Sequence, residues 1–152
     1  MNIFTVLGWE EGYSKKPFID SLGYPTIGHG TRIGPKGADL SMYQIEFSKK
    51  VAAAYMEEDV SDLLDELANR FNWYTQLTFD KQLVICSMAY QLGVNGLAKF
   101  RKMILAIERE DWASVRVEAL DSNWFDQTPE RAMRHAKVLG GEPIKIVYKD
   151  FM

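Results

Sequence analysis

The sequence is poor in the residues that several familiar classes of protein need. Cys86 is the single cysteine and the histidines are His29 and His135, which excludes an intrachain disulfide and leaves no zinc-ligand spacing. No run approaches the roughly 20 apolar residues of a membrane-spanning helix. The formal net charge of −3 lacks the basic excess with which nucleic-acid binders displace counterions. We therefore expect no metal, no cofactor, no nucleic acid and no stable membrane insertion.

The start of the chain also lacks the features of a secretory signal. Residues 1–12 carry no basic segment, and glutamates interrupt their apolar run, so we expect synthesis in a cytoplasm. What is present is an ordinary globular composition, 47% hydrophobic and 26% charged. A chain of 152 residues with this composition predicts one domain that buries a substantial core, and a monomer.

Residues 9–30 concentrate the side chains that are useful for chemistry. Glu11 ends an apolar run that predicts an N-terminal helix, and Gly12 suits the end of that helix because glycine adopts positive φ without a Cβ clash. Asp20 and Thr26 follow in an alternating stretch with a central turn, which predicts a β-hairpin. An acid at a helix end that faces an acid and a hydroxyl on a hairpin would build a cleft with two carboxylates.

The rest of the sequence has mainly helical patterns. A capping box at residues 41–44 predicts the start of a helix, which the periodic segment 59–70 continues or follows. Thr78 predicts the start of the next helix, which is apolar on nearly every side over residues 83–92. This pattern predicts a helix at the centre of a bundle that Gly93 ends. The tail, 142–152, alternates weakly and predicts a short strand or an ordered extension. Further helices are expected over residues 96–110, 112–120 and 129–139.

These elements predict one α+β, mainly helical domain with two lobes. The short N-terminal helix is not stable alone, and its apolar face suits packing on the helical lobe. A cleft between the lobes would then carry Glu11 on one side and Asp20 and Thr26 on the other. The expected division is a small β-containing lobe, a connecting helix and a larger helical lobe, over residues 13–58, 59–71, and 1–12 with 72–152.

The chemistry that suits this set of residues is cleavage of a glycosidic bond. One carboxylic acid protonates the leaving oxygen, while a second carboxylate activates water or attacks the anomeric carbon. Glu11 lies on the apolar face of its helix, which suits an acid that must keep its proton. Asp20 lies on a polar turn, which suits the ionised partner, and Thr26 is placed to hold the attacking water. Glu10 is an equally suitable acid by composition, and a solvated surface position remains open for either glutamate.

Two blocks of sequence resemble a known family. The first contains Glu11, Asp20 and the run Gly-Tyr-x-Thr-Ile-Gly-x-Gly at residues 23–30, and the second is Gln-Thr-Pro-x-Arg-Ala at residues 127–132, with Tyr-Gln-x-Gly at residues 90–93 between them. Together they resemble the phage-type lysozyme (endolysin) family, in particular its T-even members, over nearly the whole chain. The resemblance implies a lysozyme-like fold with a small β-hairpin lobe, a larger helical lobe, a joining helix and an active-site cleft between the lobes.

The resemblance also implies an activity, which is hydrolysis of the β-1,4 bond between N-acetylmuramic acid and N-acetylglucosamine in peptidoglycan, with inversion at the anomeric carbon. It implies that Glu11 is the general acid, that Asp20 is the second carboxylate and that Thr26 positions the water. It further implies that Arg131 pairs with the catalytic glutamate. The cleft positions that it implies for substrate contacts are Gln91, Tyr90 and Thr128.

The family role implies where the protein acts. An endolysin without a secretion signal stays in the host cytoplasm until a phage holin opens the membrane, and it then reaches the periplasm and the cell wall for host lysis. Peptidoglycan is therefore the expected partner.

The sequence departs from the family pattern at several positions. The family usually reads Gly-x-Gly-His after the threonine, whereas residues 28–31 read Gly-His-Gly-Thr, and Asn123 stands where T-even relatives have an arginine. Family members are often basic, and this chain is acidic. Two alternatives stay open: a lytic transglycosylase on the same bond, which the presence of Asp20 and Thr26 disfavours, and a non-catalytic protein for peptidoglycan binding or assembly.

Overall fold

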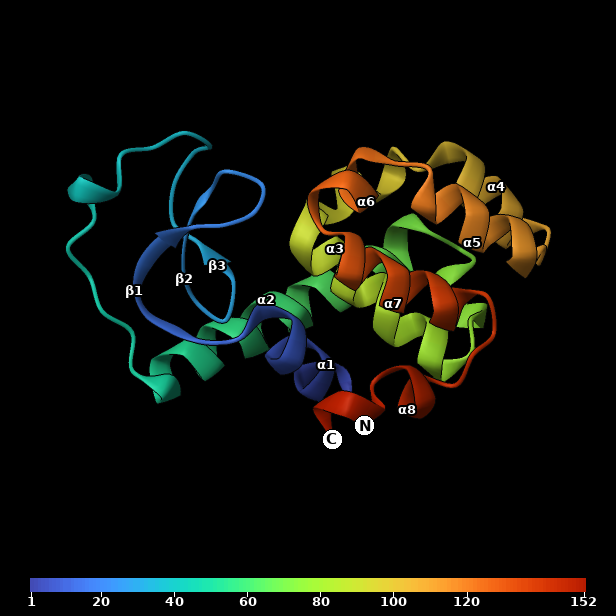
Figure 1. Cartoon of the computed structure of the whole chain (residues 1–152), viewed down its shortest axis with the longest axis horizontal. Helices are drawn as coiled ribbons and strands as arrows, with labels where there is room; N and C mark the ends of the chain where they lie inside the picture. Colours follow the sequence, from blue (N-terminus) through green and yellow to red (C-terminus); the bar gives the residue numbers. More distant parts are fainter.

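A three-stranded antiparallel sheet and eight α-helices make up the computed structural model, which describes residues 1–152. The predicted α+β, mainly helical class is confirmed. Figure 1 shows the sheet and its loops at one end, most of the helices at the other, and α2 (Lys49–Arg70) running between them. None of the helices combines the length and the apolar character needed to cross a bilayer.

The predicted hairpin is confirmed and extends into a third strand. β1 (Ser14–Ile19) pairs with β2 (Pro25–Gly28), which pairs in turn with the short β3 (Thr31–Arg32). Thr26 therefore lies in the central strand, opposite Phe18 on one side and Arg32 on the other.

The predicted N-terminal helix is confirmed as α1 (Ile3–Glu11). The Asn2 side chain caps its start by accepting a hydrogen bond from the Thr5 N–H. Gly12 ends it with φ of 64°, and its N–H donates to the Gly8 carbonyl. The catalytic candidate Glu11 is thus the last residue of a helix whose end is fixed by glycine.

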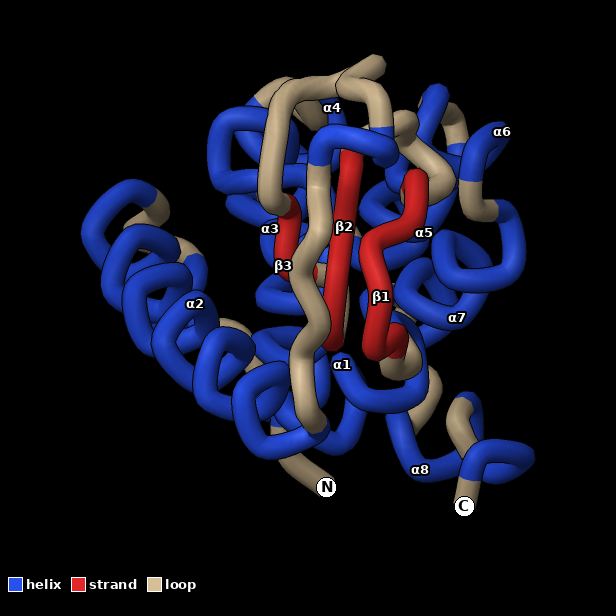
Figure 2. Tube along the Cα trace, turned by 90° about the vertical axis from the view of Figure 1, so that its left-hand side faces the viewer, coloured by secondary structure: helices blue, strands red, loops and turns tan.

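The predicted helix start at residues 41–44 is wrong. The Asp39 carboxylate caps only a short 3₁₀ turn, η1 (Leu40–Met42), and α2 begins at Lys49, where the Ser48 hydroxyl caps it. The chain stays extended between them because the Phe47 N–H donates to the Lys15 carbonyl. Figure 2 shows this extended segment crossing the outer side of the sheet before α2 begins. The connecting helix consequently starts at residue 49 and runs through the periodic segment 59–70.

The central buried helix is confirmed as α3 (Phe79–Ala98), but Gly93 kinks it instead of ending it. Gly93 has φ of 77° and ψ of 159°, and the helix resumes after it, so the expected helix 96–110 is divided between the end of α3 and α4. A short helix, α6, was not predicted. The remaining helices are α4 (Arg101–Glu108), α5 (Trp112–Leu120), α6 (Asn123–Gln127), α7 (Pro129–Leu139) and α8 (Ile144–Val147).

The tail is helical, so of the two expected alternatives the short strand is wrong and the ordered extension is confirmed. It forms α8 and a 3₁₀ turn, η3 (Lys149–Phe151), with the buried Tyr148 between them. The Tyr148 ring stacks on Trp9 of α1, with ring centroids 5.7 Å apart. This contact explains why the two ends of the chain lie near each other in Figure 1. The apolar side chains of the tail are used for packing on helices, which the weak alternation did not reveal.

Two separate hydrophobic clusters support the two ends of the molecule. The larger one is built from α1, the second half of α2 and the helices from α3 onward, and it includes Cys86. Burial raises the pKa of the Cys86 thiol to about 12, so this cysteine is an inert packing residue. The smaller cluster consists of Ile27, Phe47 and Ala52 and lies between the sheet and the start of α2. The residue bounds proposed for the two lobes stay a prediction.

Candidate active site

A cleft of about 450 Å³ lies between the sheet and the helices. The sheet side is formed by the end of β1, the β1–β2 turn and β2, and the helical side by the end of α1, by α3 and by the start of α7. The structure therefore brings together residues that are far apart in the sequence. The predicted site residues that line the cleft are Glu11, Asp20, Thr26, Gln91, Thr128 and Arg131.

Glu11 is held on the helical side by Arg131. Its Oε1 accepts a hydrogen bond of 2.7 Å from Arg131 Nη1, and its side chain is 16% exposed. Arg131 is in turn fixed to α3, because its Nη2 donates to the carbonyl and the hydroxyl of Ser87. A Cβ at Gly30 would lie 2.5 Å from Glu11 Oε2, so only glycine, here with φ of +80°, lets this turn contact the carboxylate. One carboxylate oxygen is thus paired and the other lies against the backbone of the sheet side.

Asp20 and Thr26 form the facing wall. Asp20 Oδ1 accepts hydrogen bonds of 2.9 Å from the N–H groups of Leu22 and Tyr24, which orders the β1–β2 turn. Its Oδ2 lies 3.4 Å from Arg32 Nε. The Thr26 hydroxyl donates to the Tyr24 carbonyl, so its oxygen remains able to accept a hydrogen bond from a water in the cleft. The wall therefore presents an oriented carboxylate and an oriented hydroxyl.

Gln91 and Thr128 form part of the helical wall. Gln91 Oε1 accepts a hydrogen bond of 2.8 Å from the Trp124 indole, and Gln91 Nε2 lies 3.5 Å from Thr128 Oγ1. Tyr90 is not among the residues that line the cleft, and its contact with substrate stays a prediction. Its hydroxyl donates to the His29 carbonyl, at 2.7 Å, and so joins α3 to the β2–β3 turn.

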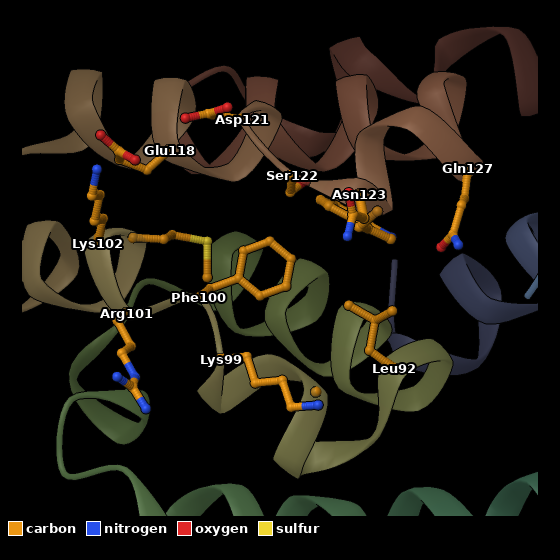
Figure 3. A pocket seen from close by; sticks show the side chains of 13 residues that line it. Leu92, Lys99, Phe100, Arg101, Lys102, Glu118, Asp121, Ser122, Asn123 and Gln127 are labelled. Carbon is orange, nitrogen blue, oxygen red and sulfur yellow. The ribbon is translucent and has the colours of Figure 1, made fainter.

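A larger hollow, of about 600 Å³, lies on the helical elements alone, between the α3–α4 junction and α5–α6. Figure 3 shows Phe100 at its centre, with Lys102 and Glu118 near each other at one end. Its carboxylates are those of Glu118, near the end of α5, and of Asp121, which directly follows α5, and no acid faces them across the hollow. Of these two hollows, only the smaller cleft therefore has acids on facing walls, as bond cleavage needs.

Glu10 has a different environment from its neighbour Glu11. Its side chain is only 1% exposed, and it accepts hydrogen bonds of 2.8 Å from Arg134 Nε and Nη2 and of 2.6 Å from the Tyr148 hydroxyl. Burial alone would raise the pKa of Glu10, but these bonds and the charge of Arg131 outweigh burial and lower it to about 2. Glu10 is therefore a buried ion-pair partner that has no proton to donate near neutral pH.

A buried chain of hydrogen bonds behind the site was missed by the sequence analysis. The Tyr148 hydroxyl donates to Glu10 and lies 3.2 Å from His135 Nδ1, while His135 Nε2 lies 2.8 Å from the Ser87 hydroxyl. Burial lowers the pKa of His135 to about 3, so its imidazole is neutral and can accept from one neighbour and donate to the other. The only feature of the sequence that could have indicated these contacts is that two consecutive acids, at residues 10–11, are matched by two arginines three residues apart on α7.

No group of three or more His, Cys, Asp or Glu side chains is arranged to hold a metal.

These buried groups predict that acid destabilises the fold. The pKa of His135 is 6.5 when unfolded and about 3 when folded, so only the unfolded chain takes up this proton, and stability is lost as the pH falls from 6.5 toward 3. The lowered pKa of Glu10, about 2 against 4.5, adds a loss between pH 4.5 and 2. We expect the free energy of unfolding, measured with urea, to be lower at about pH 5 than at about pH 7. In His135→Leu the difference between the two pH values should be smaller. An equal fall in both proteins would contradict the prediction.

Comparisons with known proteins show which sequences this chain is similar to. Residues 9–135 match a model of the phage lysozyme family. The chain is 28% identical over 159 residues to the pre-baseplate central spike protein Gp5 of Enterobacteria phage T4, an alignment that covers 91% of this chain and 28% of that protein. It is 27% identical to the probable T4-type lysozyme 1 of Dictyostelium discoideum, over 91% of this chain and 93% of that protein. It is also 27% identical to the peptidoglycan hydrolase gp36 of Pseudomonas phage phiKMV, over 80% of this chain and 13% of that protein.

Proposed function

Because the chain belongs to the phage lysozyme family, a family of glycoside hydrolases that act on peptidoglycan, we propose that it is a muramidase. It would hydrolyse the β-1,4 bond between N-acetylmuramic acid and N-acetylglucosamine. The observation that carries this proposal is the cleft itself, in which the Arg131-bound Glu11 faces Asp20 and Thr26. This arrangement supplies a proton donor on one wall and a site for an activated water on the other.

In the proposed reaction Glu11 protonates the glycosidic oxygen as the bond to the anomeric carbon breaks. The hydrogen bond from Arg131 fixes the direction of the carboxyl group. The same guanidinium stabilises the carboxylate that remains after the proton has left, which favours the transfer. Arg131 itself is held by Ser87, so the acid is oriented by groups that are rigid parts of α3 and α7.

The opposite wall activates the water. Thr26 accepts a hydrogen bond from it through the oxygen that the Tyr24 carbonyl leaves free, and Asp20 accepts the proton that the water loses on attack. Asp20 is kept in place by the Leu22 and Tyr24 N–H groups and by Arg32. Because the water attacks from the face opposite the leaving oxygen, the product has inverted configuration at the anomeric carbon.

Digestion of purified Gram-negative peptidoglycan tests this proposal. Hydrolysis with inversion produces fragments with reducing muramic ends, heavier than an anhydro product by one water, and the new end is initially the α-anomer. Mass spectrometry detects the first property and NMR of the fresh digest detects the second. A 1,6-anhydro product would identify a lytic transglycosylase, and an initial β-anomer would contradict inversion.

We further propose that the protein acts as an endolysin in host lysis. The similarity to a probable T4-type lysozyme, over 93% of that protein, supports a lytic activity for this chain. In this role it waits in the host cytoplasm and reaches the periplasm and wall after a phage holin opens the membrane. Expression in cells with an inducible holin should give lysis only after the holin is induced. Lysis without the holin would contradict this route.

A second candidate is a wall-binding or assembly module of a phage particle. It is supported by the similarity to a pre-baseplate central spike protein, of which the chain spans only 28%, and by the net charge of −3. Tight binding to purified peptidoglycan without any release of fragments, by protein that circular dichroism shows to be folded, would favour this candidate over the muramidase.

A further inference from the structure

Arg32 makes three contacts with one guanidinium group. Its Nη2 donates a hydrogen bond of 2.6 Å to the backbone carbonyl of Gln91, and its Nε lies 3.4 Å from Asp20 Oδ2. The guanidinium carbon also lies 3.9 Å from the centre of the Tyr24 ring. Only Arg32 contacts both the proposed water-activating carboxylate and the helical wall.

The contact with Gln91 crosses between the two walls of the cleft. The side-chain hydrogen bonds that join residues 13–48 to residues 71–152 are those of Arg32 with Gln91 and of Tyr90 with His29. Both end on adjacent residues of α3. The Tyr90 bond reaches only the backbone of the β2–β3 turn, so Arg32 supplies the single charged link across the walls.

The Arg32 side chain also connects Asp20, the proposed water-activating carboxylate, to the helical wall. Asp20 lies at one end of it, and at the other end is Gln91, whose side chain contacts Thr128 in the cleft. A change in the separation of the walls therefore requires Arg32 to release either Asp20 or the Gln91 carbonyl. Opening of the cleft and orientation of the carboxylate are coupled through one side chain.

The chemistry of arginine suits this position. Its planar fork donates from separate nitrogens in two directions at once and can stack flat on an aromatic ring, whereas lysine carries all its donors on one compact nitrogen. The side chain is 30% exposed and belongs to neither hydrophobic cluster, so its replacement leaves both cores intact.

We propose that Arg32 is a positioning residue that latches the sheet wall to the helical wall and holds Asp20 oriented toward the cleft. The effect on catalysis rests on the proposed muramidase function, whereas the latch itself does not. Loss of the latch lets the walls separate and releases Asp20 Oδ2, while Oδ1 keeps its hydrogen bonds from the Leu22 and Tyr24 N–H groups. The substrate then meets a carboxylate that is less firmly oriented and a site that is no longer preorganised.

Kinetics and a distance measurement test the proposal together. Arg32→Met keeps the aliphatic stem, and Lys16→Met is the matched control because Lys16 is an exposed cation of β1 that forms no ion pair. We expect Arg32→Met to lower kcat/KM by about tenfold or more, with a loss in kcat, and Lys16→Met to leave it unchanged. Arg32→Lys should be intermediate because an ammonium holds only one of the two partners, and it serves if Arg32→Met does not fold.

The distance is measured between spin labels on cysteines introduced at the exposed positions Lys36 and Glu108, because the buried Cys86 does not label. Double electron–electron resonance should show a longer or broader distance distribution in Arg32→Met than in the wild type or in Lys16→Met. An unchanged distribution overturns the latch whether or not the protein is active. In an active enzyme, unchanged kcat/KM overturns the positioning of Asp20. Absence of hydrolysis by the wild type instead refutes the muramidase proposal and leaves the distances to decide the latch.

Discussion

Glu11→Gln is expected to lower the rate of peptidoglycan hydrolysis by about 10³-fold or more while the protein stays folded. An amide has nearly the shape of the carboxyl group but no acidic proton, so the leaving oxygen is no longer protonated. The amide oxygen still accepts the hydrogen bond from Arg131 Nη1, and the side chain is partly exposed, so the contacts of α1 persist. The rate is measured from the release of reducing ends, and the fold is checked by thermal melting followed by circular dichroism.

This result must be compared with that of a second Glu→Gln variant whose glutamate lies outside the cleft. Glu108→Gln is the matched control, because Glu108 is exposed at the end of α4 and forms no ion pair. It should retain the activity and the melting temperature of the wild type. Normal turnover by Glu11→Gln would overturn the assignment of the general acid.

Glu10→Gln is expected to affect stability and not the chemical step. The free energy of unfolding should fall by about 3–5 kcal/mol. Glu10 is the buried partner of Arg134 and lies 3.9 Å from Arg131, so its neutralisation leaves Arg134 without its carboxylate, while Arg131 keeps only Glu11. For a chain of this length the loss corresponds to a fall of roughly 10 °C in melting temperature. Urea unfolding monitored by tryptophan fluorescence measures it.

The activity of Glu10→Gln separates its role from that of Glu11. Below its melting temperature the variant should keep a kcat within about tenfold of the wild type, because the proton donor is still present. A variant with unchanged stability and no turnover would show that Glu10, and not Glu11, carries the chemistry.

Local sequence signals predicted the elements whose ends are set by nearby residues. Gly12 ends α1, and the Thr-Pro pair at residues 128–129 begins α7, because capping and backbone geometry act within a few residues. The hairpin that carries Asp20 and Thr26 was predicted for the same reason. The resemblance to a known family then supplied the proposed roles of these residues.

The predictions that failed depended on distant contacts. Phe47 keeps the segment before α2 extended through its hydrogen bond with Lys15, and this pairing overrides the capping box at residues 41–44. The tail became helical because Tyr148 packs against α1. The sequence did not predict a role for Arg32, because its partner Gln91 lies 59 residues away.

The sequence by itself determined that two consecutive acids stand at the end of a helix, beside a hairpin with a third acid and a hydroxyl. Both line the cleft, and only the tertiary structure decided which of the two keeps a carboxylate available there. Successive side chains on a helix point about 100° apart, so adjacent glutamates meet different neighbours. Glu10 meets Arg134 and Tyr148, which are 124 and 138 residues away, and is buried in an ion pair. Glu11 meets Arg131, 120 residues away, at the edge of the cleft, where one side of its carboxylate remains available for chemistry.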